Sequence, residues 1–127
     1  MGEEKDSAPI RSYRDLDVWQ MAVELAVECY RYTARLPAFE GYGMVTQIRR
    51  SSASIAANIA EGHGRETTGA FVQFLRIAQG SLKELETHLI IADRAGLPGR
   101  DAIEALLAKA DRVGKMLRSM IRSLQRR

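Results

Sequence analysis

The sequence predicts an all-α fold, an up-down-up-down antiparallel four-helix bundle. No segment alternates apolar and polar residues as a strand does, and apolar residues recur instead at the spacing of helical turns. Glycine and proline residues divide the chain into four long segments with short connections between them. Long helices with short connections pack as antiparallel neighbours, so the four segments predict a bundle.

The chain has 127 residues, the size of one domain. We expect a flexible lead-in over residues 1–12 and a four-helix bundle domain over residues 13–127. The start of the sequence is acidic and polar, no apolar run is long enough for a membrane, and the single Cys29 excludes an intrachain disulfide. A cytoplasmic protein with no membrane partner is therefore expected.

The first helix is predicted to run from Asp15 or Asp17 to Leu36. Either aspartate can cap its start, and Pro37 prevents its continuation. Its apolar stripe is wider than one partner helix requires, because further apolar residues lie beside it. The stripe and its neighbours are Val18, Ala22, Leu25, Cys29, Tyr32 and Leu36, flanked by Trp19, Ala26, Tyr30 and Thr33.

The second helix is predicted to run from about Tyr42 to Ala60. Larger apolar residues mark one side of it, and most of the remaining residues are alanine or serine. Small side chains let neighbouring backbones approach closely, so we expect this helix to be tightly packed. The larger apolar residues are Val45, Ile48, Ile55 and Ile59.

The third helix is predicted from Thr68 to Ala95, with Thr67 as its N-cap and Gly96 in the left-handed position after its end. Leucines recur every seven residues along it. They are Leu75, Leu82 and Leu89.

The fourth helix is predicted from Asp101 to Leu124, where Asp101 and Glu104 resemble a capping box. Its apolar residues form a face of the width that a bundle requires. They are Ile103, Leu106, Ala110, Val113, Leu117, Met120 and Leu124.

The segment NIAEGHGRET, residues 58–67, invites a phosphate-loop interpretation. A phosphate loop follows a strand and needs a Lys-Ser/Thr pair or a third glycine, and this segment has neither. We therefore predict a corner between two helices, with positive φ angles at Gly62 and Gly64.

Three polar residues of this corner have alternative roles. Asn58 is expected to hydrogen-bond to the backbone or to fix the register of the helices. Glu61 can cap the corner, or can pair with Arg65 or with a neighbouring chain. Arg65 lies beside the start of the third helix, whose free N–H groups attract anions, so it is also a candidate anion-binding residue.

Neither a metal site nor an enzyme active site is expected. His63 and His88 are far apart in sequence and belong to no ligand motif, and His88 occupies a position suited to a partly buried structural role. Cys29 falls on an apolar stripe, where a thiol is usually inert. No nucleophile, base and orienting group can be assembled, so we predict a protein without cofactor or catalysis.

The cations indicate an anionic partner. The net charge is +3, and fifteen of the nineteen basic residues are arginine, whose fork binds phosphate in a bidentate manner. One basic strip follows the fourth helix, on the side away from its apolar face, and spans about four turns, farther than the helix dipole alone explains. The strip comprises Arg112, Lys115, Arg118, Arg122 and Arg126.

The second helix adds two more cations, Arg49 and Arg50. These, Arg65 and the strip are the candidate residues for binding RNA or DNA, mostly through the phosphate backbone. The alternative is an oligomeric scaffold or adaptor that binds a protein partner and has no nucleic-acid role.

Three blocks, RDLDVWQMAVELA, QIRRSSASIAANIAEGHGR and FLRIAQGSLKELETHL, resemble a known family. It is the four-helix bundle family encoded in intervening sequences of bacterial 23S ribosomal RNA genes, and the resemblance covers about residues 12–96. Members resemble the accessory variability determinant protein of diversity-generating retroelements, which forms a pentameric ring and binds nucleic acid and a reverse transcriptase. The resemblance implies a bundle that assembles with itself as a homopentamer. The mild charge of +3 departs from a strongly basic nucleic-acid-binding relative.

Overall fold

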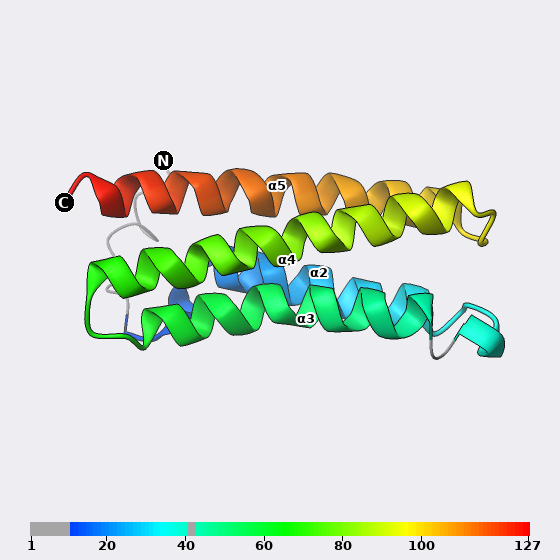
Figure 1. The fold of residues 1–127 in the computed structure, drawn as a ribbon, viewed down its shortest axis with the longest axis horizontal. Helices are drawn as coiled ribbons and strands as arrows, with labels where there is room; N and C mark the ends of the chain where they lie inside the picture. Colours follow the sequence, from blue (N-terminus) through cyan, green and yellow to red (C-terminus); the bar gives the residue numbers. More distant parts are fainter. Residues whose placement is uncertain (1–10, 41–42) are drawn as a thin grey trace.

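The computed structural model describes residues 11–40 and 43–127, and this part of the chain contains helices and no strands (Figure 1). Residues 1–10 of the expected lead-in, and the expected helix start at Tyr42, lie outside the described residues. The elements are η1 (Tyr13–Asp15), α2 (Asp17–Thr33), η2 (Ala38–Glu40), α3 (Met44–His63), α4 (Thr68–Arg94) and α5 (Arg100–Gln125).

The four α-helices form the predicted four-helix bundle. Helix α3 packs against α2 and α4, and α5 packs against the same two helices. Helices α3 and α5 therefore occupy opposite corners of the bundle. Figure 1 shows that successive helices run in opposite directions along its long axis.

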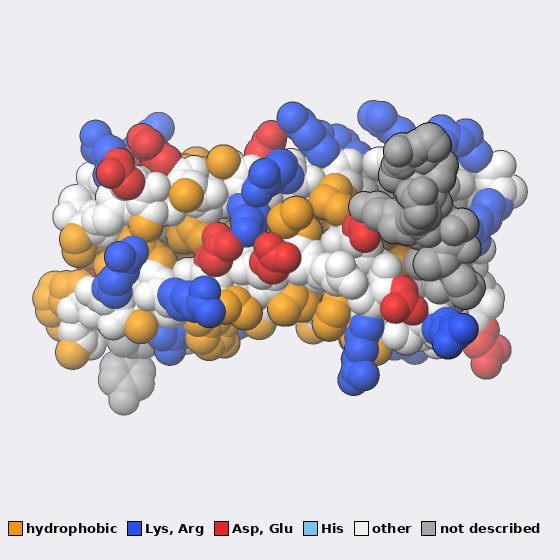
Figure 2. Space-filling model, turned by 180° about the vertical axis from the view of Figure 1, so that it is seen from behind, with side chains coloured by type: hydrophobic (Ala, Val, Ile, Leu, Met, Phe, Trp, Pro, Cys, Tyr) orange, Lys and Arg blue, Asp and Glu red, His pale blue; other side chains and the backbone are white. Residues whose placement is uncertain are grey.

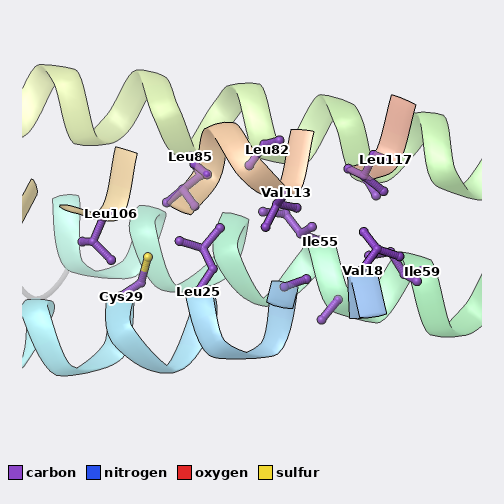
Figure 3. Close-up of a cluster of buried hydrophobic side chains, with 14 of the residues drawn as sticks. Val18, Leu25, Cys29, Ile55, Ile59, Leu82, Leu85, Leu106, Val113 and Leu117 are labelled. Atoms are coloured by element: carbon purple, nitrogen blue, oxygen red, sulfur yellow. The ribbon is translucent and has the colours of Figure 1, made fainter. Parts of the chain in front are cut away.

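The predicted apolar stripes of all four helices meet in one core. Figure 3 shows side chains from each helix pointing into it. Burying one large aliphatic side chain contributes about 1.5–3 kcal/mol relative to leaving it exposed. The largest fully buried side chains are Leu25, Cys29, Ile48, Ile55, Ile59, Leu75, Leu82, Leu85, Leu89, Ile103, Val113 and Leu117.

Neither aspartate caps α2, so that prediction is wrong. Asp15 belongs to the preceding turn, where its carboxylate accepts hydrogen bonds from the backbone N–H groups of Arg11 at 2.8 Å and Ser12 at 3.2 Å. These two bonds lower the pKa of Asp15. Helix α2 begins after Leu16, which provides no side-chain cap.

Helix α2 also ends at Thr33, three residues before the predicted end at Leu36. The Thr33 hydroxyl donates to the Cys29 carbonyl at 2.8 Å, and the backbone N–H groups of Arg35 and Leu36 close only short turns, each bonding three residues back. Leu36 is nevertheless buried against the core. The apolar stripe therefore continues beyond the regular helix.

The predicted positive φ angles at Gly62 and Gly64 are wrong. Helix α3 continues through Gly62 to His63, and Gly64 has a φ of −78°. A Cβ added to Gly62 would lie 2.6 Å from the Cβ of Phe74 and 3.1 Å from the Cδ1 of Phe71. Gly62 is needed because α4 passes too close to leave room for a side chain.

The turn between α4 and α5 confirms the predicted role of Gly96. Its φ is +87°, its N–H donates to the Asp93 carbonyl at 3.1 Å, and the Leu97 N–H donates to the Ala92 carbonyl at 3.0 Å. These two bonds form a Schellman motif, which satisfies the last carbonyls of α4. At the other end of α4, the Thr67 Oγ1 accepts from the Ala70 N–H at 3.1 Å, as predicted.

The predicted capping box of α5 is wrong. The helix begins at Arg100, and its N-cap is Gly99, with a φ of +94° and no side-chain cap. Asp101 therefore lies inside the first turn, where its charge complements the helix dipole. The turn is instead attached to α2, because the Tyr32 hydroxyl donates to the Pro98 carbonyl at 2.9 Å.

Candidate nucleic-acid interface

The predicted basic strip lies on the exposed side of α5. Its five cations are all exposed, while most apolar residues between them are buried against the core and Met116 and Met120 are partly buried. The helical period therefore places the cations on the side away from the buried residues. The buried residues in this half of α5 are Val113, Leu117, Ile121 and Leu124.

The C-terminal half of the strip surrounds a shallow hollow of about 300 Å³, lined by Lys115, Arg118, Ser119, Arg122 and Arg126. Lys115, Ser119, Arg122 and Arg126 follow one another at intervals of three or four residues, so they lie on one side of the helix. Ser119 was not predicted as a site residue. The same spacing identifies it in the sequence, because it falls between two cations.

Most cations of the strip have no partner within the described part of the chain. Lys115 pairs with Asp111 of the preceding turn at 3.2 Å. The side chains of Arg112, Arg118, Arg122 and Arg126 form no ion pair or hydrogen bond with another described residue. Within the described residues, these four guanidinium groups therefore have no anionic partner. Figure 2 shows Lys and Arg side chains along the upper edge of the molecule, where α5 lies.

Arg49 is engaged within the bundle. Its Nε donates to the Thr33 hydroxyl at 2.8 Å and its Nη2 to the Tyr30 carbonyl at 3.3 Å. Its guanidinium also lies over the Tyr30 ring, 4.7 Å from the centroid. These contacts bridge α3 and α2, so much of the binding capacity of Arg49 is already used.

The other two predicted arginines outside α5 also have partners. Arg50 pairs with Glu84 of α4, and this hydrogen bond is the main cause that lowers the pKa of Glu84. Arg65 pairs with Glu61 at 2.8 Å, and its guanidinium lies 4.7 Å from the centre of the Phe74 ring. The structure does not bring Arg49 and Arg50 of α3 together with the strip, because α3 and α5 occupy opposite corners.

Asn58 contributes to a polar cluster between α3 and α4. Its Nδ2 donates to the Ser54 carbonyl at 2.8 Å and to the Ser54 hydroxyl at 3.0 Å. The Ser54 hydroxyl is also 2.8 Å from the hydroxyl of Ser81 on α4. Each of these polar groups is therefore satisfied at a half-buried position.

A second surface feature is apolar and lies on another side of the bundle. Side chains of α2 and α3 line an open groove of about 610 Å³. Two of them are large and well exposed, Val27 at 42% and Tyr30 at 44%. Figure 2 shows hydrophobic side chains gathered in its lower half, where α2 lies. The groove is lined by Val23, Ala26, Val27, Tyr30, Arg31, Ala34, Ala53 and Ala56.

The described histidines and cysteine form no cluster. No group of three His, Cys, Asp or Glu side chains that could hold a metal ion occurs in residues 11–40 and 43–127. His88 is mostly buried, with its Nε2 3.6 Å from the Glu84 carboxylate. Cys29 is fully buried, and burial raises the pKa of its thiol to about 12.

Among the described residues, no helix is both long and apolar enough to cross a bilayer.

The chain is similar to a known protein family and to a solved structure. Residues 14–119 match the family described as 23S rRNA-intervening sequence protein. A crystal structure of a protein of unknown function from the S23 ribosomal protein family of Bacteroides thetaiotaomicron is 28% identical, with a TM-score of 0.77. The similarity covers 83% of this chain and 95% of that chain. A search of curated proteins finds no match.

Proposed function

This chain belongs to the 23S rRNA-intervening sequence protein family, and from that premise we propose that it is a non-enzymatic, homo-oligomeric bundle that binds RNA or DNA. The observation that carries the proposal is the strip on α5. Four arginines there share one exposed side of a helix, and none of them pairs with a described carboxylate. Arginine binds phosphate with two parallel hydrogen bonds, so a row of arginines without a partner among the described residues suits a polyphosphate backbone.

The proposed contact is with phosphates rather than with bases. Helix α5 is held against α2 and α4 by its apolar side, so it cannot leave the bundle to enter a groove of the nucleic acid. Contacts to phosphate fix the position of a protein on nucleic acid but do not read sequence. Binding that is independent of sequence and strongly dependent on salt is therefore expected.

The oligomeric part of the proposal rests on the groove between α2 and α3. We propose that a second copy of this chain covers it and that five copies close a ring, the assembly that the family resemblance implies. The groove is apolar, and half of its lining residues are alanine, whose small side chains permit close contact between helices. Because α5 is diagonally opposite α3, a partner seated in this groove does not itself cover the strip.

Fluorescence anisotropy with a labelled nucleic acid tests the binding. The double variant Arg118→Glu/Arg122→Glu should lose most of the affinity measured at about 50 mM salt, where phosphate contacts are strongest. The matched control is Arg76→Glu/Arg94→Glu, which makes the same charge change at two exposed arginines of α4. The control should retain affinity within a few-fold. No detectable binding of RNA or DNA by the wild-type protein would overturn the proposal.

Light scattering tests the assembly independently of binding. Val27→Glu places a charge in the groove and should reduce the measured mass toward that of the 14.2 kDa chain. Ile91→Glu makes a similar change at a 46% exposed position of α4 and should leave the mass unaltered. A wild-type mass equal to one chain would remove the oligomer from the proposal.

The groove also favours a second candidate function, a scaffold or adaptor that binds a different protein. Binding measurements on the variants described above distinguish the scaffold from the nucleic-acid-binding protein. A scaffold would show no salt-dependent binding to nucleic acid, and its partner would be lost in Val27→Glu but retained in Arg118→Glu/Arg122→Glu.

A further inference from the structure

We infer that the strip binds double-stranded nucleic acid in preference to single strands, an inference that rests on the proposed nucleic-acid binding. The reasoning uses what surrounds the cations of α5, their spacing and the rigidity of the helix that carries them.

The strip has no aromatic side chain on which a base could stack. Proteins that hold single strands combine a positive groove with aromatic rings, and each stacked base contributes about 1–3 kcal/mol. Helix α5 contains no Phe, Tyr or Trp. The large exposed rings of the described residues, Tyr30 and Phe39, belong to α2 and the connection after it. A single strand on α5 would therefore gain phosphate contacts alone.

Phosphate contacts alone favour the ligand with the higher charge density. A duplex carries one charge per about 1.7 Å of its axis, and one strand carries one per about 3.4 Å. From Arg112 to Arg126 the strip extends about 21 Å, at about 1.5 Å per residue. Over that length a duplex presents about twelve phosphates and one of its strands about six, so the field that meets the strip is about twice as dense.

The strip is also rigid, which suits a rigid ligand. Its cations project from one uninterrupted helix that is packed against two others, so they form a nearly straight row. A duplex is straight over about 150 base pairs and needs no ordering before it meets such a row. A flexible single strand would have to be straightened, and that ordering lowers its affinity.

Ser119 strengthens the interpretation of the hollow as a phosphate position. Its hydroxyl is a neutral donor between Lys115 and Arg122 on the same side of the helix. A phosphate oxygen in the hollow can accept from a hydroxyl and from guanidinium groups together. Such a position binds any phosphodiester, whatever base it carries, so the preferred duplex can be DNA or RNA.

The test compares a ten-base-pair duplex with each of its two separated strands, all labelled, from 50 to 200 mM salt. The short duplex limits binding to about one strip. If four cations contact phosphates, the slope of log affinity against log salt should be about −3.6 for duplex and about −2.8 for single strand. Duplex affinity should exceed single-strand affinity at least tenfold at 50 mM salt, and a second duplex of different sequence should bind equally.

Arg122→Gln sharpens the test, because removing one phosphate contact should reduce the duplex slope by about 0.9. Arg94→Gln on α4 is the matched control and should leave the slope unchanged. Single strands that bind as tightly as the duplex would overturn the inference while leaving the proposed function standing. Failure of both forms to bind would overturn the proposed function, and the inference with it.

Discussion

Two helix contacts in this bundle are built in opposite ways. Helices α3 and α4 approach closely at Gly62, which has no side chain and lies against Phe74 with no space for a methyl group. Helices α2 and α5 are joined by long side chains that reach across. Lys109 of α5 contacts Glu28 at 2.6 Å and Glu24 at 3.4 Å.

The difference shows how one sequence encodes two kinds of helix contact. The α3–α4 contact depends on the missing side chain of a single glycine. A side chain added there could not be accommodated by a rotamer change, because the atom it would meet is a Cβ fixed to the backbone. A contact made by long charged side chains adapts easily and contributes little free energy at the surface. The α3–α4 contact should therefore be sensitive to small substitutions, and the α2–α5 contact should tolerate them.

The largest expected effect is at Gly62. Gly62→Ala should lower the free energy of unfolding by about 1–3 kcal/mol, because the new methyl group forces α3 and α4 apart. Gly80→Ala is the matched control, since Gly80 is also inside a helix but has nothing within 4 Å of an added Cβ. That control should raise stability by up to about 1 kcal/mol. Urea unfolding measures both, and equal midpoints for the two variants would contradict the packing argument.

An intermediate effect is expected where α5 begins. Gly99 has a φ of +94°, and an added Cβ would lie 2.9 Å from the Tyr32 ring of α2. Gly99→Ala should lower the free energy of unfolding by about 1–2 kcal/mol because of the left-handed backbone alone. The close contact with the Tyr32 ring should lower it further. Gly96→Ala isolates the backbone part, because Gly96 has a φ of +87° and nothing within 4 Å. Thermal unfolding should rank Gly99→Ala as less stable than Gly96→Ala, and the reverse order would show that the Tyr32 contact is unimportant.

The smallest effect is expected at Lys109. Lys109→Met should cost about 0.2–1 kcal/mol at neutral pH, because the glutamates it contacts are substantially exposed. The hydrogen bond that Lys109 donates to Glu28 raises the pKa of Lys109 above its ordinary value of 10.5. The folded state therefore holds this proton more tightly than the unfolded state, and the stabilisation is complete below pH 10.5 and disappears as pH rises through the raised pKa.

Urea unfolding at several pH values checks the sign of this effect. The difference between the wild-type protein and Lys109→Met should be constant at neutral pH and should vanish in strong alkali. Lys83→Met is the control, because Lys83 pairs with Glu86 of its own helix at an exposed position. A difference that grows with rising pH would contradict the assigned cause.

The helical spacing in the sequence was sufficient to predict the bundle, since the core forms where apolar residues recur every three or four positions. It also predicted which side of α5 is basic, because the period places Arg118 and Arg122 on the other side of the helix from Val113 and Leu124. These properties can be predicted from the sequence because they depend only on the positions of residues within one helix.

Properties that depend on a second helix were harder to predict. Gly62 was interpreted as a turn residue because its closeness to Phe74 arises only when α4 folds back. The predicted cap at Asp101 failed because the attachment of the preceding turn to Tyr32 is a tertiary contact. Likewise, the separation of Arg49 and Arg50 from the strip follows from helix order around the bundle, which no local pattern contains.

The burial of Cys29 has a practical consequence for labelling this protein. It is the only cysteine of the sequence, its side chain is fully buried, and its thiol stays protonated because its pKa is about 12. Thiol reagents act on the thiolate, so they should leave the folded native protein unlabelled near pH 8. A cysteine introduced as Ser119→Cys would then carry a fluorophore at one defined place, beside the hollow of α5, without any change to the protein's own thiol.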